Sequence, residues 1–427
     1  MHQRTSSSHS ICVVGADTHN LRRLERLTKY REYRFVPMFR RSEIRGDLAA
    51  PLPVLLDEAV ADVRAHPPAG VITTWDYPAN EVARHLSRML GLPGPTLRSV
   101  LGWSHKYWAR KIQERVTTGA VPEFAVADPF DPETADTPVI DPPVWIKPVR
   151  ATNSALAFRA DTPEEYRAAI GRLKDGIDVF AHPLDYLMKL ADLPRWFRAV
   201  DGRSCVVERS IRGSRCTVSA MVHDGHPRVL GVFDSHEDSS TSAFSAFTYP
   251  SRLPSSVLER LEEITISLLN ANMLDESGVN VEYFYDPSSD TITILELNPR
   301  FSQSHAPLFE YVDGTSSLEL LVDLATGHEP QFQPRSGRFA TAGKFFLRRH
   351  EGGVVLHAPS PAEVSRVEHE FDCEIELKVA EGDVIAPRIT GHPVAPAVAH
   401  IYLGADSFEE LDERFARIAN RLDFTFE

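Results

Sequence analysis

The chain has 427 residues, of which 42% are hydrophobic and 25% charged, and its mean hydropathy is -0.23. This length and composition predict a soluble globular protein with two or three domains. The formal net charge of -14 argues against binding to a nucleic-acid backbone, which needs a basic surface, and favours a small-molecule ligand.

No apolar run approaches the roughly 20 residues that span a bilayer. Residues 1–10 lack the apolar core of a secretory signal, so we expect a flexible tail there, no membrane association and a cytoplasmic location. The four cysteines show no CxxC spacing and are expected to be buried thiols. They are Cys12, Cys205, Cys216 and Cys373.

Strands alternate with helices in the first hundred residues. The apolar segment 11–17 ends in Gly and Asp and is followed by a helical pattern, and residues 70–95 repeat the order of strand, polar loop and helix. Such alternation indicates a parallel sheet covered by helices. We therefore predict a Rossmann-like domain over residues 11–102.

The middle of the chain contains a helix, a loop and a hairpin. A helix carrying the sequence WSHKYWARKIQERV is predicted to end before Gly119 and Pro122, and an acidic, proline-rich loop then leads to the strand VWIKP. Residues 206–233 alternate like a hairpin about the Asp224-Gly225 turn.

Further along, a helix is predicted at 255–271. Beyond Pro330, a segment rich in Val, Ile and Gly is followed by an amphipathic helix at 408–422. This part is predicted to be a separate α+β segment.

Residues 279–305 predict a β-hairpin, because apolar residues alternate on two arms around a Pro/Ser/Asp turn. A turn centred on Ser289 places Glu282 opposite Glu296 and Asn280 opposite Asn298. The same register places the two acids on one face of the hairpin together with Phe284, Ile292 and Ile294. The acids are therefore predicted to lie on an apolar face.

Facing acids repel each other unless a cation lies between them. Oxygen ligands of this kind suit Mg²⁺. Arg300 follows the acids within four residues of Glu296, and the whole set fits a nucleoside triphosphate with its metal. The alternatives are a solvated acidic hairpin without metal, a register that separates the acids, and an Arg300 that only pairs with Glu296.

Taken together, these pieces resemble the ATP-grasp superfamily, and within it the carboxylate–amine ligases with a biotin-carboxylase-like architecture. The resemblance covers most of the chain and is carried by the motifs GLPGPTLRSVLGWSHK, PPVWIKPVRATNSA, VVERSIRG, VNVEYFYD and LELNPR. It implies a multidomain α/β and α+β fold. An ATP-grasp domain over 103–335, with a mobile lid at about 141–233, would be followed by a C-terminal α+β domain over 336–427.

The resemblance also implies roles for particular residues, with ATP and Mg²⁺ as cofactors and Mn²⁺ as an alternative metal. The implied metal ligands are Glu282, Glu296 and Asn298. The implied nucleotide-binding residues are Lys106, Lys147, Arg150, Thr152, Asn153, Ser154, Glu208 and Ile211. The implied catalytic or substrate-orienting residues are Arg300, Lys147, Ser304 and His305.

Each of these residues also has a structural interpretation. Lys106 is alternatively a solvated helix residue and Glu208 a surface acid at a strand end. His305, as a lone histidine, is equally well explained as a structural residue.

Three departures from the family pattern bear on the chemistry. The loop 150–155 has no glycine to bring backbone N–H groups to phosphate. Arg215 stands where the pattern has an acid for the ribose. Ser304 stands where biotin carboxylases have an acid that activates bicarbonate, which argues against bicarbonate chemistry.

The expected function is that of an ADP-forming ligase, which joins a carboxylic acid, by default an amino acid, to an amine through an acyl phosphate. The alternatives are a biotin-carboxylase-like or other carboxylate-activating enzyme and a non-catalytic nucleotide-binding protein. Small-molecule substrates are the expected partners, and the resemblance leaves room for a homodimer. Residues considered for the substrate site are Phe244, Phe247, Lys344, Arg348 and Arg349.

Overall fold

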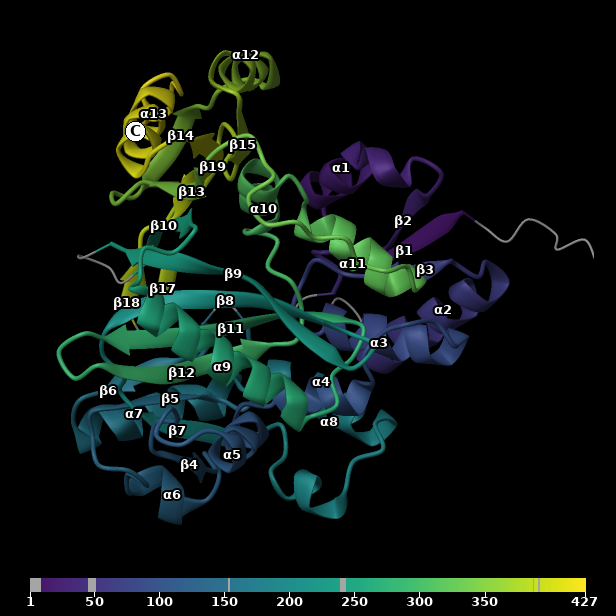
Figure 1. The fold of residues 1–427 in the computed structure, drawn as a ribbon. Coiled ribbons are helices and arrows are strands. Elements are labelled where there is room, and N and C mark those ends of the chain that lie inside the picture. Colours follow the sequence, from purple (N-terminus) through teal and green to yellow (C-terminus); the bar gives the residue numbers. More distant parts are fainter. Residues whose placement is uncertain (1–8, 45–50, 153, 239–242, 387, 391) are drawn as a thin grey trace, which may run out of the picture.

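The computed structural model describes residues 9–44, 51–152, 154–238, 243–386, 388–390 and 392–427. Its N-terminal strands form a parallel sheet in the order β2-β1-β3, flanked by helices (Figure 1). The elements are β1 (Ser10–Ala16), α1 (Thr18–Arg26), β2 (Arg34–Arg40), α2 (Leu52–Ala65), β3 (Gly70–Ile72) and α3 (Ala79–Leu90). The predicted parallel sheet is confirmed, and the buried β1 has the apolar run typical of a strand covered on both faces.

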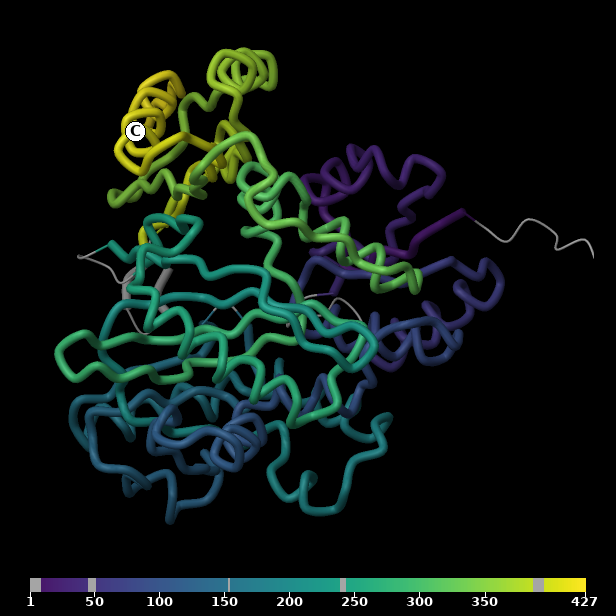
Figure 2. Tube along the Cα trace, in the orientation of Figure 1, coloured from purple at the N-terminus to yellow at the C-terminus, as the bar shows by residue number. Residues whose placement is uncertain are grey.

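Segments distant in sequence pack against this sheet. In Figure 2 the tube of α11 (Ser317–Thr326) runs beside the N-terminal strands, following α10 (Ala306–Asp313). A Cβ atom on Gly70 would lie 2.9 Å from the carbonyl oxygen of Ala325, so β3 and α11 are in close contact. The N-terminal and central parts of the chain therefore share one buried core.

A second, four-stranded antiparallel sheet has the order β4-β7-β5-β6. Its elements and the nearby helices are β4 (Phe124–Ala127), α6 (Pro132–Asp136), β5 (Val144–Pro148), β6 (Phe158–Ala160), α7 (Pro163–Gly176), α8 (Asp178–Leu190) and β7 (Cys205–Arg209). With α7 this small sheet encloses an apolar cluster of its own, which includes Ile146, Leu173 and Val207. A unit with its own core can move as one body.

The third sheet has eight strands in the order β12-β11-β8-β9-β10-β13-β19-β15. They are β8 (Ser214–His223), β9 (His226–Glu237), β10 (Phe244–Tyr249), β11 (Ser277–Asp286), β12 (Thr291–Asn298), β13 (Thr341–Arg348), β15 (Cys373–Leu377) and β19 (Ala397–Ala405). Helix α9 (Ser255–Ala271) packs on one part, and α12 (Pro361–Phe371) and α13 (Phe408–Ala419) on another (Figure 1).

The eight-stranded sheet corrects two expectations about how the chain is organised. Strands β13, β15 and β19, from the range 336–427, are hydrogen-bonded into it, so the C-terminal segment does not build a separate main sheet. The range expected for the lid, 141–233, includes β5 to β7 but also β8 and most of β9, which belong to the large sheet. The domain boundaries themselves stay predictions.

The remaining strands are short. β14 (Gly353–His357), β16 (Val384–Ile385) and β20 (Thr425–Phe426) form a three-stranded sheet, and β17 (Arg388–Thr390) pairs with β18 (His392–Val394). All four cysteines are buried and free, as predicted. Among the described residues, no helix is both long and apolar enough to cross a bilayer.

Two local predictions were wrong. The single helix expected around WSHKYWARK is two helices, α4 (Leu97–Ser104) and α5 (Lys106–Val116), because His105 between them has an extended backbone. The hairpin expected over 206–233 begins only at β8, since β7 pairs with β4 and β5 in the small sheet. The β8–β9 hairpin about Asp224-Gly225 is confirmed.

The acidic hairpin contains a bulge that the alternation did not reveal. Glu282 faces Glu296, but the next residue, Tyr283, faces Ile294, so Leu295 is inserted between two paired positions. The insertion turns Ile292 and Ile294 into the core beside Tyr283. The prediction that these two isoleucines share the face of the acids was therefore wrong.

Candidate active site

The two acids predicted to bind metal face each other on neighbouring strands. Glu282 on β11 pairs with Glu296 on β12, and Asn280 pairs with Asn298, in the predicted register. Asn298 Nδ2 lies 3.2 Å from Glu296 Oε1 and 3.4 Å from Glu282 Oε1, so the three side chains converge. Carboxylate and amide oxygens are the ligands that Mg²⁺ and Mn²⁺ accept, and these residues therefore fit such an ion.

The two carboxyl groups do not ionise alike. Burial raises the pKa of Glu282; Arg215 opposes this rise and the charge of Glu296 adds to it. Burial would also raise the pKa of Glu296, but Lys106 and Lys147 outweigh it and lower the value. A divalent cation between the acids would favour the charged form of both.

Arg215, found where the family pattern has an acid, is bonded to this pair. Its Nη2 lies 2.5 Å from Glu282 Oε2, its Nη1 lies 3.7 Å from Glu237, and its guanidinium lies over the ring of Phe244. The arginine therefore balances part of the negative charge of the acids.

Lys106 is the first residue of α5, and the helix start is fixed by its backbone N–H, which donates to Val149 O at 2.8 Å. Its Nζ lies 4.0 Å from Glu296 Oε2, and its side chain is only 15% exposed. Burial, despite Glu296, lowers the pKa of Lys106 to about 8. Lys106 is therefore not a solvated helix residue but a buried cation at the acid pair.

Lys147 and Glu208 form an ion pair inside the small sheet. Lys147 Nζ on β5 lies 2.6 Å from Glu208 Oε2 on β7, and Glu208 Oε1 accepts from Arg110 Nε at 2.8 Å. Burial would raise the pKa of Glu208, but Arg110 and Lys147 outweigh it and lower the value to about 2. Glu208 is a buried ion-pair partner, and the surface-acid alternative is excluded by its 3% side-chain exposure.

Arg110 was missed in the sequence and connects two sheets. Besides Glu208, it donates to the carbonyl oxygens of Ile294 at 2.9 Å and Leu295 at 2.7 Å, beside the bulge of the acidic hairpin. Its spacing was the available signal, because Arg110 follows Lys106 by four residues and so lies on the same face of α5.

Arg150 is held by acids of the N-terminal domain. Its guanidinium lies 2.8 Å from Glu81 and 2.7 Å from Asp76, and it is buried. Asp76 also lies 3.4 Å from Arg300 Nη2. Burial would raise the pKa of Asp76, but Arg150 and Arg300 lower it overall. Its Nε and Nη2 donate to these two carboxylates, and Arg150 also lines the cavity beside Lys106 and Glu296, so its role at phosphate stays a prediction.

The other residues expected to bind nucleotide lie in two loops. Thr152 is half-buried, and Ser154 is exposed with a φ of 54°. Asn153 lies outside the described residues. Ile211 is half-buried in the connection from β7 to β8. Their roles stay predictions.

Ser304 and His305 follow the motif arginine and lie at the start of α10. Ser304 Oγ accepts a hydrogen bond from Lys344 Nζ at 2.9 Å. The ring of His305 is buried and stacks on Phe233 with centroids 3.8 Å apart. Burial, with Lys344 and Arg300 nearby, lowers the pKa of His305 to about 3. His305 is therefore a neutral, packed ring at neutral pH.

The space between the four-stranded sheet and the acidic hairpin of the eight-stranded sheet is narrow. A cavity of about 10 Å³, room for about one water, is lined by residues that include Lys106, Arg110, Glu208, Glu296 and Asn298. A nucleotide in this place would require the small sheet to move away from the acids.

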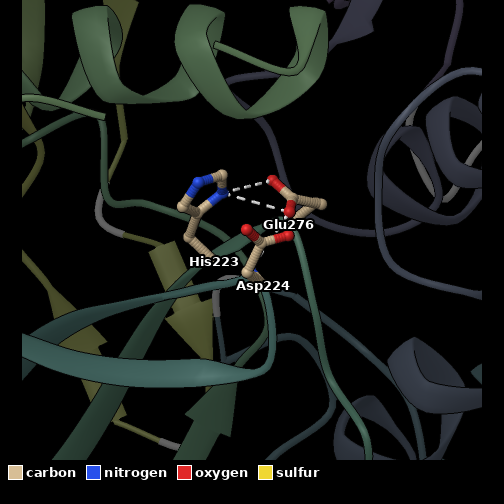
Figure 3. Close-up of side chains that lie close together, drawn as sticks. All are labelled: His223, Asp224 and Glu276. Atoms are coloured by element: carbon tan, nitrogen blue, oxygen red, sulfur yellow. Dashed lines mark hydrogen bonds and ion pairs between the residues drawn. The ribbon is translucent and has the colours of Figure 1, made fainter. Parts of the chain in front are cut away.

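A second cluster lies at the turn of the β8–β9 hairpin (Figure 3). His223 Nδ1 lies 3.0 Å from Glu276 and its Nε2 lies 3.0 Å from Glu329, while Asp224 stands beside them. Burial would lower the pKa of His223, but the bonds to the two glutamates outweigh it and raise the value. Each ring nitrogen of His223 lies at hydrogen-bond distance from a carboxylate, so the cluster forms two ion pairs when the ring is protonated, and we call it the His223 latch.

Comparison with known proteins agrees with this geometry. Residues 140–307 match the family described as ATP-grasp domain. Residues 140–307 are therefore similar to an ATP-grasp domain, in agreement with the resemblance that the motifs carry. The carbamoyl phosphate synthase large chain of Mycobacterium tuberculosis is 25% identical over 131 residues, which are 29% of this chain and 11% of that protein. The match thus spans about a tenth of the curated relative.

Solved structures resemble the whole chain. The L-amino acid ligase from Bacillus licheniformis superposes with a TM-score of 0.72 and 15% identity, covering 99% of this chain and 100% of that chain. The biotin carboxylase domain of Hydrogenobacter thermophilus 2-oxoglutarate carboxylase, a complex with MgADP and bicarbonate, superposes with a TM-score of 0.70 and 14% identity, covering 99% and 92%. At these identities the comparison shows the fold alone.

Proposed function

We propose that this protein is an ADP-forming ligase that joins a carboxylic acid, by default an amino acid, to an amine. The observation that carries the proposal is the convergence of Glu282, Glu296 and Asn298 from two strands on Lys106 and Lys147 from two other elements. Oxygen ligands beside buried ammonium groups suit the phosphates and metal of ATP.

Mg²⁺ held by Glu282, Glu296 and Asn298 would neutralise charge on the phosphates and orient them. Lys106 and Lys147 add positive charge from the α5 start and from β5. Glu208 holds Lys147 in place through an ion pair in which Oε2 lies 2.6 Å from Nζ. Positioning and charge neutralisation of this kind account for most of the catalysis of phosphoryl transfer.

Two transfers follow. An oxygen of the acid attacks the γ-phosphorus of ATP and ADP leaves, which gives an acyl phosphate. The neutral nitrogen of the amine then attacks the acyl carbon, phosphate leaves with the bonding electrons, and the nitrogen loses a proton. Arg300, paired with Asp76 at 3.4 Å, would orient the acid and stabilise negative charge on the reacting oxygens.

Ser304 separates this proposal from bicarbonate chemistry. It stands where the carboxylase pattern has an acid, and its hydroxyl accepts from Lys344. A serine is neutral near pH 7 and is a poor base for bicarbonate. The fold shared with the biotin carboxylase domain does not by itself favour that reaction.

The test measures ADP release with pairs of amino acids and, separately, with hydroxylamine as the nucleophile. We expect ADP release that depends on Mg²⁺ and on an organic acid, with formation of a hydroxamate. ADP formation that requires biotin and bicarbonate would replace the ligase by a carboxylase, and nucleotide binding without any turnover would indicate a non-catalytic protein. A homodimer is the proposed assembly, which light scattering tests.

A further inference from the structure

Lys344 is a buried lysine without an acidic partner. It is 5% exposed, and its Nζ donates to the neutral Ser304 Oγ at 2.9 Å. Among the described residues, no carboxylate oxygen lies within 4.0 Å of this ammonium group, whereas Lys106 and Lys147 each lie near a glutamate. Burying an ammonium group without a close counter-charge is costly. Burial lowers the pKa of Lys344 to about 7, although the more distant Glu376 opposes this fall.

Strand β13, which carries Lys344, has an apolar cluster on one face and the candidate active site on the other. Phe345 points into the apolar cluster beneath α12 and α13. Lys344 and Phe346 point to the opposite face, where Lys344 pairs in register with Phe247 on β10 and Tyr402 on β19. This face lies toward Ser304 and His305, so the ammonium group belongs to the surroundings of the candidate active site.

Half-buried aromatic rings lie next to the ammonium group. Lys344 Nζ is 4.7 Å from the centroid of Phe346, whose ring is 5.4 Å from that of Phe247. Phe247 in turn is 4.8 Å from Phe244 and 5.9 Å from His305. The site therefore offers the Lys344 ammonium group beside an apolar surface. Arg348 lies 5.1 Å from the centroid of Phe346, but its guanidinium donates to the carbonyl oxygen of Phe244.

This surface adjoins the proposed catalytic groups on two sides. Arg215, which binds Glu282, lies 4.6 Å over the ring of Phe244. On the other side, His305 lies within the electrostatic influence of both Lys344 and Arg300. Arg300 is already assigned to the acid that reacts with ATP, and the acid pair is assigned to the metal. Lys344 is left for a second anionic group.

We propose that Lys344 binds the carboxylate of the acceptor, so that the amine substrate is an amino acid whose apolar side chain packs on Phe244, Phe247 and Phe346. This inference rests on the proposed ligase function. It narrows the acceptor from any amine to one that carries a carboxylate of its own. A carboxylate at Lys344 would give the buried ammonium group an ion-pair partner at hydrogen-bond distance, which Glu376 is too distant to provide.

The test compares acceptors that differ only in the carboxylate: L-phenylalanine with 2-phenylethylamine, and L-leucine with 3-methylbutylamine. Calorimetric titration into the MgADP-bound enzyme gives their affinities, and amide formation gives their KM values. We expect the amino acids to bind about 10- to 100-fold more tightly than the amines, as a charge-assisted hydrogen bond implies. Lys344→Met should remove this difference.

Two matched variants serve as controls. Lys344→Arg keeps the charge and should keep the preference for the amino acid. Lys174→Met removes an exposed lysine on α7, which does not act on Lys344, and should change nothing. Equal affinity of the wild-type protein for amino acid and amine, no binding of either, or a preference that survives Lys344→Met overturns the inference.

Hydroxamate formation separates this inference from the ligase proposal. It requires the acid and ATP but no amino acid acceptor, so Lys344→Met should form hydroxamate at the wild-type rate. A parallel loss of hydroxamate and amide would assign Lys344 to the acid instead and overturn the inference. Absence of hydroxamate in the wild-type protein would contradict the ligase function, and the titrations would still decide whether Lys344 binds a carboxylate.

Discussion

Arg110 Nε lies 2.8 Å from Glu208 Oε1, in an ion pair whose side chains are 2% and 3% exposed. The pair joins α5 to the small sheet, while the same guanidinium donates to carbonyl oxygens of the acidic hairpin. One side chain thus links the lysine-bearing sheet to the acids that would bind metal, and this link has to loosen when the sheet moves for nucleotide.

Arg110→Met is predicted to destabilise the protein by about 3 to 5 kcal/mol, because it leaves Glu208 buried with a single counter-charge and two carbonyl groups without donors. Urea unfolding followed by circular dichroism measures this change. The control is Lys111→Met, the next residue, whose pair with Glu114 is largely exposed and should contribute less than about 1 kcal/mol. Similar stability of both variants would show that the buried pair does not hold the sheets together.

Glu296→Gln is predicted to reduce ADP formation by about 100-fold or more, because a charged metal ligand is lost. The protein should still fold, with a slightly lower melting temperature, because Lys106 and Lys147, which lower the pKa of Glu296, lose a counter-charge. Activity and thermal unfolding are measured on the same preparation. Glu262→Gln, at an exposed glutamate on α9, should alter neither. Retained activity in Glu296→Gln would refute the metal assignment.

Lys147→Met is predicted to raise the Kd for MgATP by about 10- to 100-fold, because a charge-assisted hydrogen bond to phosphate is removed. Calorimetry measures this affinity. The double variant Lys147→Met, Glu208→Gln should bind ATP as weakly while regaining stability, since Glu208 is no longer left with one counter-charge. Lys174→Met, an exposed lysine on α7, serves as the control. ATP affinity equal to wild type would remove Lys147 from the site.

The small sheet is predicted to move when nucleotide binds, because the present cavity holds about one water. Hydrogen exchange of the segment from β5 to β6 should slow in the presence of MgATP, including the backbone of residues 150–155. Strand β1, far from the cavity in the N-terminal sheet, provides an internal reference. Equal exchange of the β5–β6 segment in both states would contradict a closing lid.

The His223 latch is predicted to stabilise the protein more at low than at high pH. The pKa of His223 is raised in the folded protein, so its contribution is complete below the unfolded value and is lost as pH rises through the folded value. His223→Gln should therefore cost more stability at pH 6 than at pH 9. Unfolding curves at both values measure this, with His66→Gln, an exposed histidine on the surface, as the control. A cost independent of pH would show that the ring acts only by packing.

Local pattern was enough for several features of this protein. Alternating residues and a polar turn predicted the pairing of Glu282 with Glu296, because side chains of a strand repeat every two residues. The order of strand and helix predicted the parallel N-terminal sheet. In both cases the paired strands are only a few tens of residues apart in the sequence, so the short connection limits how they can pair.

Contacts between distant segments were decided only by the tertiary structure. The bulge at Leu295 reverses the direction of Ile294, and Arg110, which lies 184 positions earlier, bonds the carbonyl groups beside it. Arg150, expected at phosphate, is also held by Glu81 from another domain. No periodicity in the sequence encodes such partners.

The pairing of the C-terminal strands was likewise not predictable from the sequence. Their sequence predicted strands and a helix, but not that β13 would pair with β10 and place Lys344 beside Ser304. Which sheet edge a strand joins depends on the shape and hydrogen bonding of the rest of the molecule. The sequence by itself therefore determined the acids and their facing register. The folded chain alone decided which cations surround the acids and that Lys344, farther along, is buried beside a neutral hydroxyl.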